Sequence, residues 1–337
     1  MKIHEVARRA GVSTATVSRT INKPSLVDPQ TAKRVWKVIE KLRYYPNTQA
    51  RALVSGRSRI LGLIVSDITN PFFPELIKGF EDIAIQNGYE ILVSSTNYDS
   101  ARMALCVRRM LERNVEGVAI MTSEMDKHLL DQLARRNVPM VFLDVGITGA
   151  GVSRVVVDYA MGVNEAMDHL LSLGHRRIGF ISGPWALKSA RIRRTAFLRS
   201  LGAYGIDEDK RLVAEGDHTV DGGLLAMAQM LASKCAPTAL LASNDLTAIG
   251  AMRAVRRAGL SVPRDVSIVG FDDIRLAEFT EPPLTTVHLS REELAEHAFH
   301  ALLGAGAQAD GRRKAEHAVE THLVIRETTC PVCTQRS

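Results

Sequence analysis

The stretch VARRAGVSTATVSRTIN, residues 6–22, decides the N-terminal fold of this chain. It predicts two short helices separated at Gly11, and Ser13 is a good N-cap for the second helix. Four small apolar side chains can pack in the angle between the two helices: Ala7, Ala10, Val12 and Val17. The rest of the second helix is small or polar, which leaves it free to enter a groove. This is the layout of a helix-turn-helix, whose second helix docks in the major groove of DNA.

A third helix should follow, with Asp28 as its N-cap and Pro29 at its first position. Apolar residues then recur on one helix face and can close a three-helix core. We expect a helix-turn-helix domain over residues 1–46 and a linker over residues 47–59. The first half of the linker could form two helical turns and the second half is rich in Gly, Ser and Arg, so we expect it to become ordered only on binding.

The positive charge of the chain is concentrated at its N-terminus. Of 43 Lys and Arg and 37 Asp and Glu, residues 1–59 hold 13 basic and three acidic residues, a net charge of +10. The remaining 30 basic and 34 acidic residues give a net charge of −4. A basic head on an acidic core favours binding to a phosphate backbone.

The bulk composition is that of an ordinary globular protein, with 46% hydrophobic and 24% charged residues. We find neither an N-terminal secretory signal nor an apolar run long enough to span a membrane, and expect a cytoplasmic protein. Cys330 and Cys333 form a lone C-x-x-C pair, which is insufficient for a zinc site. The sequence contains no phosphate-binding loop and no nucleophile elbow, so we expect no cofactor, no metal and no catalytic residues.

From Ile60 onward, apolar runs of strand length alternate with amphipathic helices. Such alternation predicts βαβ units and parallel sheets, which is an α/β fold. Two such series predict an effector-binding and dimerisation core over residues 60–330 with two similar lobes. We expect lobe one over about residues 60–158 plus 290–318, and lobe two over about residues 159–288 plus 319–327.

Ligands of open parallel sheets bind outside the carboxyl ends of the strands. Two lobes that face each other across these edges would form a cleft for a small molecule. The candidate positions follow the predicted strands: residues 67–73, Asp144, Asp158, residues 182–193, residues 243–245 and residues 271–273.

The head carries the motifs Glu5-Val6-Ala7 through Val17-Ser18-Arg19, and then Tyr45-Pro46-Asn47. The core adds Asn70-Pro71-Phe72-Phe73, residues 174–179, Gly270-Phe271-Asp272 and residues 283–287. With these motifs the chain resembles the LacI–GalR (lac/gal repressor) family of bacterial transcription regulators. The resemblance covers about residues 3–327. It implies a core similar to periplasmic sugar-binding proteins, with two lobes joined by three crossovers.

The resemblance assigns DNA contacts residue by residue. Thr14 and Ala15 fall on base-reading positions, and Arg19 falls on another groove-facing position. Phosphate contacts are implied for Ser13, Thr16, Ser18 and Asn22. A hinge helix that folds on specific DNA is implied over Asn47, Ala50 and Leu53, with Leu53 as the side chain that wedges into the minor groove.

For the effector cleft, the resemblance implies contacts from Phe72, Phe73, Asp158, Ser189, Arg193 and Asp272. Leu187 departs from purine-binding relatives, which have an arginine there, and this weakens a purine effector. Carboxylates and a guanidinium can pair with hydroxyl groups, so a sugar suits the set. Because Arg191, Arg193 and Arg194 cluster, a carboxylated or phosphorylated sugar stays open. Trp185 could also line the cleft, or it could pack within its own loop. His218 could reach the mouth of the cleft.

The function expected from sequence is therefore a repressor that binds a palindromic operator as a homodimer. Its DNA affinity is expected to be controlled by a small molecule, a sugar or sugar derivative, in the cleft between the two lobes. A purine or another metabolite is the alternative effector. A solute-binding receptor without a DNA role is the alternative function, and the basic head argues against it. No leucine heptad follows residue 327, so we expect a dimer and not a tetramer. Whether the effector releases or strengthens DNA binding, and which operator is bound, stays open.

Overall fold

The computed structural model describes residues 3–45, 57–122, 125–144, 151–233, 235–307 and 317–332. The chain divides into two compact units, Met1–Ser58 and Arg59–Ser337. The predicted hinge residues Asn47, Ala50 and Leu53 lie outside the described residues. Among the described residues, no helix is long and apolar enough to cross a membrane.

The first unit is a small bundle built on the predicted helices. It contains α1 (Ile3–Ala10), α2 (Thr14–Asn22), the 3-10 turn η1 (Pro24–Leu26) and α3 (Pro29–Leu42). Asp28 caps α3 by accepting a hydrogen bond from the Thr31 amide at 2.9 Å. Of the side chains expected between the first two helices, Ala7, Ala10 and Val17 are buried and Val12 is partly buried. The same core also holds Val6, Val35 and Ile39.

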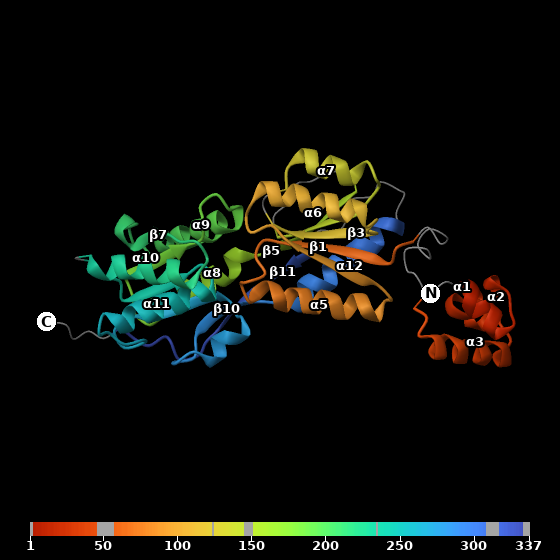
Figure 1. Cartoon of the computed structure of the whole chain (residues 1–337). Helices are drawn as coiled ribbons and strands as arrows, with labels where there is room; N and C mark the ends of the chain where they lie inside the picture. Colours follow the sequence, from red (N-terminus) through yellow and green to blue (C-terminus); the bar gives the residue numbers. More distant parts are fainter. Residues whose placement is uncertain are drawn as a thin grey trace. The chain divides into compact units, whose positions relative to one another are not determined.

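The second unit contains two six-stranded sheets, each the centre of one lobe (Figure 1). In the first lobe the strand order is β11-β5-β4-β3-β1-β2, and neighbouring strands are parallel. Its strands are β1 (Ile60–Val65), β2 (Glu90–Ser95), β3 (Gly117–Met121), β4 (Met140–Leu143), β5 (Val152–Val157) and β11 (His317–Val319). Its helices are α5 (Phe72–Gln86), α6 (Ser100–Glu112), α7 (Lys127–Ala134) and α12 (Arg291–Ala307).

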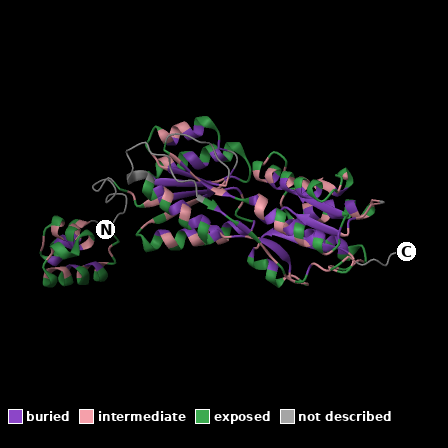
Figure 2. Ribbon diagram, turned by 180° about the vertical axis from the view of Figure 1, so that it is seen from behind, coloured by how far each residue is buried: buried purple, intermediate pink, exposed green. Residues whose placement is uncertain are grey.

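Both faces of the first sheet are covered by helices, with α5 and α12 on one face and α6 and α7 on the other (Figure 1). Successive side chains of a strand point to opposite faces. In β1, Leu61 and Leu63 accordingly belong to the apolar cluster that includes α5, whereas Ile64 belongs to the cluster that includes α6. This burial on both faces explains why the strand sequences are continuous apolar runs (Figure 2).

The second lobe repeats this arrangement with one difference. The strand order is β12-β10-β9-β8-β6-β7, and the edge strand β12 is antiparallel to β10. Its strands are β6 (Ile178–Ser182), β7 (Val213–Glu215), β8 (Ala239–Ala242), β9 (Ser267–Asp272), β10 (Thr285–Leu289) and β12 (Thr321–Val324). Its helices are α8 (Tyr159–Ser172), α9 (Lys188–Ala203), α10 (Val220–Ala232) and α11 (Asp245–Arg257), with short 3-10 turns η2 (Lys210–Leu212) and η3 (Arg275–Phe279). The α/β architecture is as expected, although β10 was not anticipated from sequence.

Three crossovers join the lobes: β5 to α8, β10 to α12, and β11 to β12. The first and third are bonded to each other. The Asp158 amide donates to the Val319 carbonyl at 3.0 Å. The Thr321 hydroxyl donates to the Asp158 carbonyl at 2.6 Å and accepts from the Gly162 amide at 2.9 Å. A Cβ at Gly162 would lie 2.3 Å from Val287, so only glycine allows this close approach.

Candidate functional site

The turn between α1 and α2 fixes the orientation of α2 relative to α1. Gly11 has a left-handed backbone (φ 65°), which glycine adopts without strain. The Val12 amide donates to the Ala7 carbonyl at 3.0 Å and so closes the turn. Ser13 then caps α2, because its hydroxyl accepts from the Thr16 amide at 3.1 Å.

The predicted DNA-contacting residues of α2 differ in how available their side chains are. Ser13, Ala15, Arg19 and Asn22 are exposed, while Thr14, Thr16 and Ser18 are half-buried. The Asn22 amide group donates back to the Ser18 carbonyl at 2.9 Å. Arg19 forms no ion pair with another described residue, and is therefore the free cation of this helix.

Charged side chains of the neighbouring helix α1 form ion pairs with one another. Glu5 pairs with Arg8 and Arg9, each at 2.7 Å. The hydrogen bond from Arg8, followed by that from Arg9, lowers the pKa of Glu5 to about 2. The carboxylate of Glu5 thus offsets one of the two positive charges of Arg8 and Arg9, whereas the charge of Arg19 is not offset by an ion pair with another described residue.

The second unit contains a cavity of about 100 Å³ where the two sheets meet. This is well above the ~10–15 Å³ that one water molecule needs. Its lining comes from the carboxyl ends of strands of both lobes and from the turns and helices that follow them, as expected for open parallel sheets. The lining residues are Ser66, Asn70, Phe72, Phe73, Tyr98, Met121, Thr122, Leu143, Asp144, Tyr159, Leu187, Lys188, Ser189, Arg193, His218, Asn244, Asp272 and Leu289.

Five of the six predicted effector residues line this cavity: Phe72, Phe73, Ser189, Arg193 and Asp272. Asp158 is not among the lining residues. Its exposed carboxylate instead caps α8 by accepting from the Met161 amide at 3.1 Å. The adjacent Tyr159 takes the place in the cavity that sequence reasoning gave to Asp158.

The remaining residues proposed for the cleft differ in whether they line the cavity. His218 lines the cavity, whereas Trp185 does not. Arg191 donates to the carbonyls of Trp185 and Ala186, both at 2.8 Å, and Arg194 lies 3.4 Å from Glu208. The cluster of three arginines therefore contributes only Arg193 to the cavity.

Arg193 lies at the centre of the cavity wall and is 5% exposed. Its guanidinium lies 4.8 Å from the centroid of the Tyr159 ring and 5.0 Å from that of Phe271. Its Nε has no hydrogen-bond partner among the described residues. A buried cation held by aromatic faces keeps its N–H groups available for a ligand.

Two carboxyl groups face this cation, one from each lobe. Burial raises the pKa of Asp144 to about 6, against the opposing effects of Tyr159 and Arg193. Burial raises the pKa of Asp272 to about 7, again against Arg193. His218 stays neutral, because burial first and Arg193 second lower its pKa to about 3. Near neutral pH the cavity thus offers carboxyl oxygens, a guanidinium and a neutral imidazole.

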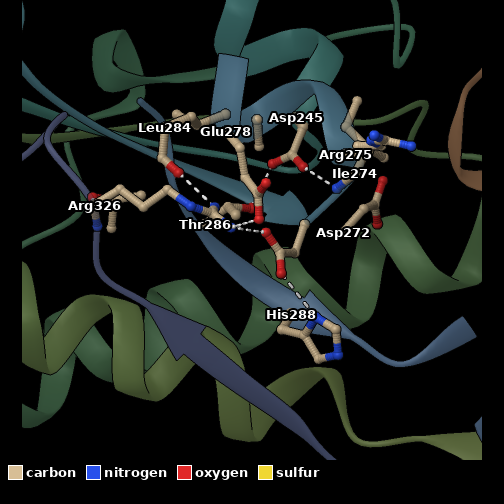
Figure 3. Close-up of polar contacts among 12 residues, drawn as sticks. Asp245, Asp272, Ile274, Arg275, Glu278, Leu284, Thr286, His288 and Arg326 are labelled. Carbon is tan, nitrogen blue, oxygen red and sulfur yellow. Dashed lines mark hydrogen bonds and ion pairs between the residues drawn. The ribbon is translucent and has the colours of Figure 1, made fainter. Parts of the chain in front are cut away.

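The turn that ends β9 carries Asp272 and is strongly constrained from within the second lobe. Asp245 accepts from the Ile274 amide at 2.8 Å and from the Thr286 hydroxyl (Figure 3). The carboxylate of Asp273 lies 2.7 Å from Arg326 and 2.8 Å from His288. Polar groups on β10, α11 and the segment after β12 therefore hold the cavity residue in place.

A helix-turn-helix unit together with a two-lobed core that encloses a polar cavity defines a DNA-binding regulator controlled by a small molecule. Comparisons agree with this class. Residues 2–47 match the model for "Bacterial regulatory proteins, lacI family", and residues 167–329 match that for "Periplasmic binding protein-like domain". The chain belongs to the lacI family of bacterial regulatory proteins; it is a transcription regulator and not an enzyme.

Individual relatives match along almost the whole chain. The HTH-type transcriptional repressor PurR of Photobacterium profundum is 33% identical over 327 residues, covering 97% of this chain and 98% of that protein. The lac repressor dimer bound to operator and the anti-inducer ONPF superposes with a TM-score of 0.86 at 30% identity, covering 98% of this chain and 99% of that one. The transcriptional regulator CelR in complex with cellobiose gives a TM-score of 0.70 at 30% identity, covering 97% and 99%.

Proposed function

We propose that this chain represses transcription as a homodimer on a palindromic operator in the cytoplasm, and that a small sugar in the cavity controls its affinity for DNA. Two-fold protein symmetry and an inverted-repeat site go together for helix-turn-helix proteins. A structural relative is a dimer bound to operator, which supports the assembly.

For DNA contact we propose the exposed side of α2 and the linker. Thr14, Ala15 and Arg19 would face bases, and Ser13, Thr16, Ser18 and Asn22 would face phosphates. Asn47, Ala50 and Leu53 would form the hinge element in the minor groove. Because Thr14 and Ala15 are small, we expect much of the specificity to come from Arg19, from bending of DNA and from half-site spacing.

The observation that carries the sugar assignment is the placement of Asp144 and Asp272 around Arg193, with aromatic side chains as further walls. Hydroxyl groups can donate to the carboxylates and accept from the guanidinium at the same time. Phe72 and Phe73 add apolar surface, with their ring centroids 5.4 Å apart and nearly perpendicular. Proposed effector contacts are therefore Phe72, Phe73, Ser189, Arg193 and Asp272, and Asp144 joins them. Asp158 would act through the cap of α8 and not through contact.

A purine is the second candidate, because aromatic walls can stack on a flat heterocycle. Leu187 lines the cavity and offers no hydrogen bond at the position where purine-binding relatives have an arginine. The sugar assignment therefore stands first.

Thermal unfolding of the full chain tests the effector class. The panel contains D-ribose, D-glucose, D-galactose, cellobiose, D-glucuronate, D-glucose 6-phosphate, hypoxanthine and guanine. We expect a monosaccharide to raise the unfolding midpoint, and Asp272→Asn to abolish that increase. A midpoint raised only by hypoxanthine or guanine would overturn the sugar assignment.

Selection of binding sites from random duplex DNA tests the other half of the proposal. We expect the selected sites to be inverted repeats, and sedimentation at micromolar concentration to show a dimer before and after DNA binding. The sugar that raises the midpoint should change operator affinity, and the operator should change sugar affinity by the same factor. Independent binding of the two would contradict control by this sugar.

A further inference from the structure

The turn over residues 272–275 has an unfavourable backbone. Asp272 (φ 107°) and Asp273 (φ 55°) are consecutive non-glycine residues in the left-handed region. Such conformations are energetically unfavourable and persist only where surrounding contacts maintain them. The contacts to this turn therefore determine where the Asp272 side chain lies in the cavity.

Two of these contacts come from the first lobe, although the turn belongs to the second. Arg291 is the first residue of α12, and its Nη1 donates to the Asp272 carbonyl at 2.6 Å and to the Leu289 carbonyl at 3.1 Å. Its Nη2 lies 3.2 Å from Glu75 on α5. The other oxygen of Glu75 accepts from the Arg275 amide at 3.1 Å. One ion pair of the first lobe thus holds both ends of the turn.

The environment of this ion pair argues against a role in stability alone. The Arg291 side chain is 11% exposed and that of Glu75 is 30% exposed. Removing charges from water costs free energy, so a largely buried ion pair contributes little or nothing to stability compared with apolar residues of similar size. The pair does have a strong geometric effect, because each partner also bonds to the backbone of the other lobe.

We propose that Glu75 and Arg291 are positioning residues for effector binding: they hold the Asp272 turn from the opposite lobe, so that the turn has its full set of contacts only when the lobes are closed. Neither residue lines the cavity. Separation of the lobes breaks both bonds to the turn and leaves it held only from within the second lobe, by Asp245, His288 and Arg326. An effector that binds to the closed lobes then shifts the equilibrium toward closure, and closure in turn raises the affinity for the effector. A regulator needs this coupling. The inference rests on the proposed role of Asp272 as an effector contact.

Hydrogen–deuterium exchange of the full chain tests the positioning step without any small molecule. We compare the wild type with Glu75→Ala, Arg291→Met, the double variant, and Glu81→Ala as a control from the exposed side of α5. In each single variant the peptide covering residues 272–276 should exchange about tenfold faster or more, as expected when a hydrogen bond to a charged group is lost. The double variant should exchange no faster than the single ones, because the two residues act as a unit.

Two further results distinguish a positioning role from a general loss of stability: the region in which exchange increases, and the effect of a conservative substitution. Arg291→Lys keeps the charge beside Glu75 and should restore part of the protection, while the control variant should match the wild type. Unchanged exchange of the turn in both single variants would overturn the proposal. An equal increase throughout the second lobe would also overturn it, since it would show global loss of stability.

The sugars of the panel above test the consequence for binding. For whichever of them raises the unfolding midpoint of the wild type, Glu75→Ala and Arg291→Met should weaken binding about tenfold or more, and Glu81→Ala should not. Unchanged affinity in both variants would contradict the role in effector binding. If no panel sugar binds the wild type, the proposed function fails, while the exchange result still decides whether the two residues hold the turn.

Discussion

The Arg193 guanidinium lies 4.8 Å from the centroid of the Tyr159 ring, on the wall of the cavity. A ring face attracts the cation without occupying its N–H edges. Asp144 and Asp272 face the cavity from different lobes, and Arg193 is the cation that lowers the pKa of both. Arg193 therefore connects the ligand chemistry of the two lobes.

Replacement of Arg193 by methionine should reduce effector affinity by about 10- to 100-fold, because hydrogen bonds to a charged group are lost while the apolar stem still packs between the rings. Isothermal titration with the sugar identified by thermal unfolding measures this loss. Arg194→Met serves as the control, since Arg194 points to Glu208 and does not line the cavity. Equal affinities of wild type and Arg193→Met would rule out this role.

The raised pKa of Asp272, about 7, predicts a specific pH dependence of stability. The folded chain favours the neutral carboxyl group, so the stabilising contribution is complete below the ordinary pKa of 3.8 and is lost as pH rises through about 7. His218 has the opposite effect, since its pKa of about 3 in the folded chain reduces stability as pH falls below 6.5.

Comparison with Asp272→Asn isolates the carboxyl group, because His218 is present in both proteins. Between pH 5 and pH 8 the unfolding free energy of the wild type should fall relative to that of the variant, by an amount on the order of 2 kcal/mol. Urea unfolding at four pH values measures the difference. A difference that is constant, or that grows in favour of the wild type with pH, would show that Asp272 is not neutral in the folded chain.

Arg19 should carry sequence discrimination and not merely general attraction to DNA. Arg19→Ala should weaken binding to the selected operator by about 1–3 kcal/mol and leave binding to unrelated duplex DNA much less changed. Gel-shift titrations on both duplexes provide the measurement. Arg8→Ala is the matched control, because Arg8 is paired with Glu5 on α1. Equal weakening on both duplexes would indicate a phosphate contact.

Thr321 should be sensitive to loss of its hydroxyl alone. Thr321→Val keeps the shape but leaves the Gly162 amide and the Asp158 carbonyl without their buried partner. We expect a loss of about 1–3 kcal/mol in the unfolding free energy. Thr329→Val is a suitable control, since the Thr329 hydroxyl bonds to the His169 side chain at 2.9 Å and does not join the crossovers. A loss no greater than that of the control would mean that this bond does not stabilise the crossovers.

Sequence patterns predicted the elements whose signals are local. The strands and helices that follow Ile60 alternate as predicted, because caps, turns and apolar runs mark them. Strand β10 was missed, since its sequence TTVHL has little apolar character and its burial depends on β9 and β12 beside it. The antiparallel direction of β12 likewise depends on a crossover that no local pattern specifies.

The site shows the same division between local and long-range information. The rule that ligands bind at the carboxyl ends of strands placed the cavity correctly, and the family motifs gave five of its lining residues. Asp158 and Tyr159 are adjacent at the carboxyl end of β5, where α8 begins. The direction in which each side chain leaves the first turn of α8 decides which of them faces the cavity. The proposed roles of Glu75 and Arg291 had no sequence signal, because Glu75 bonds to Arg275, 200 positions further along the chain.

The late return of the chain to the first sheet has a consequence for biosynthesis. Helix α12 covers that sheet, and the ring centroid of its Phe299 lies 6.3 Å from that of Phe80 on α5. Residues 291–307 and β11 are nevertheless synthesised after nearly the whole second lobe. On the ribosome the N-terminal unit can fold first, whereas the first lobe must wait with an apolar face uncovered. Nascent chains of this protein are therefore most exposed to aggregation and chaperone capture while the second lobe is being translated, and a stop codon before residue 291 would leave two incomplete lobes and a complete DNA-reading head.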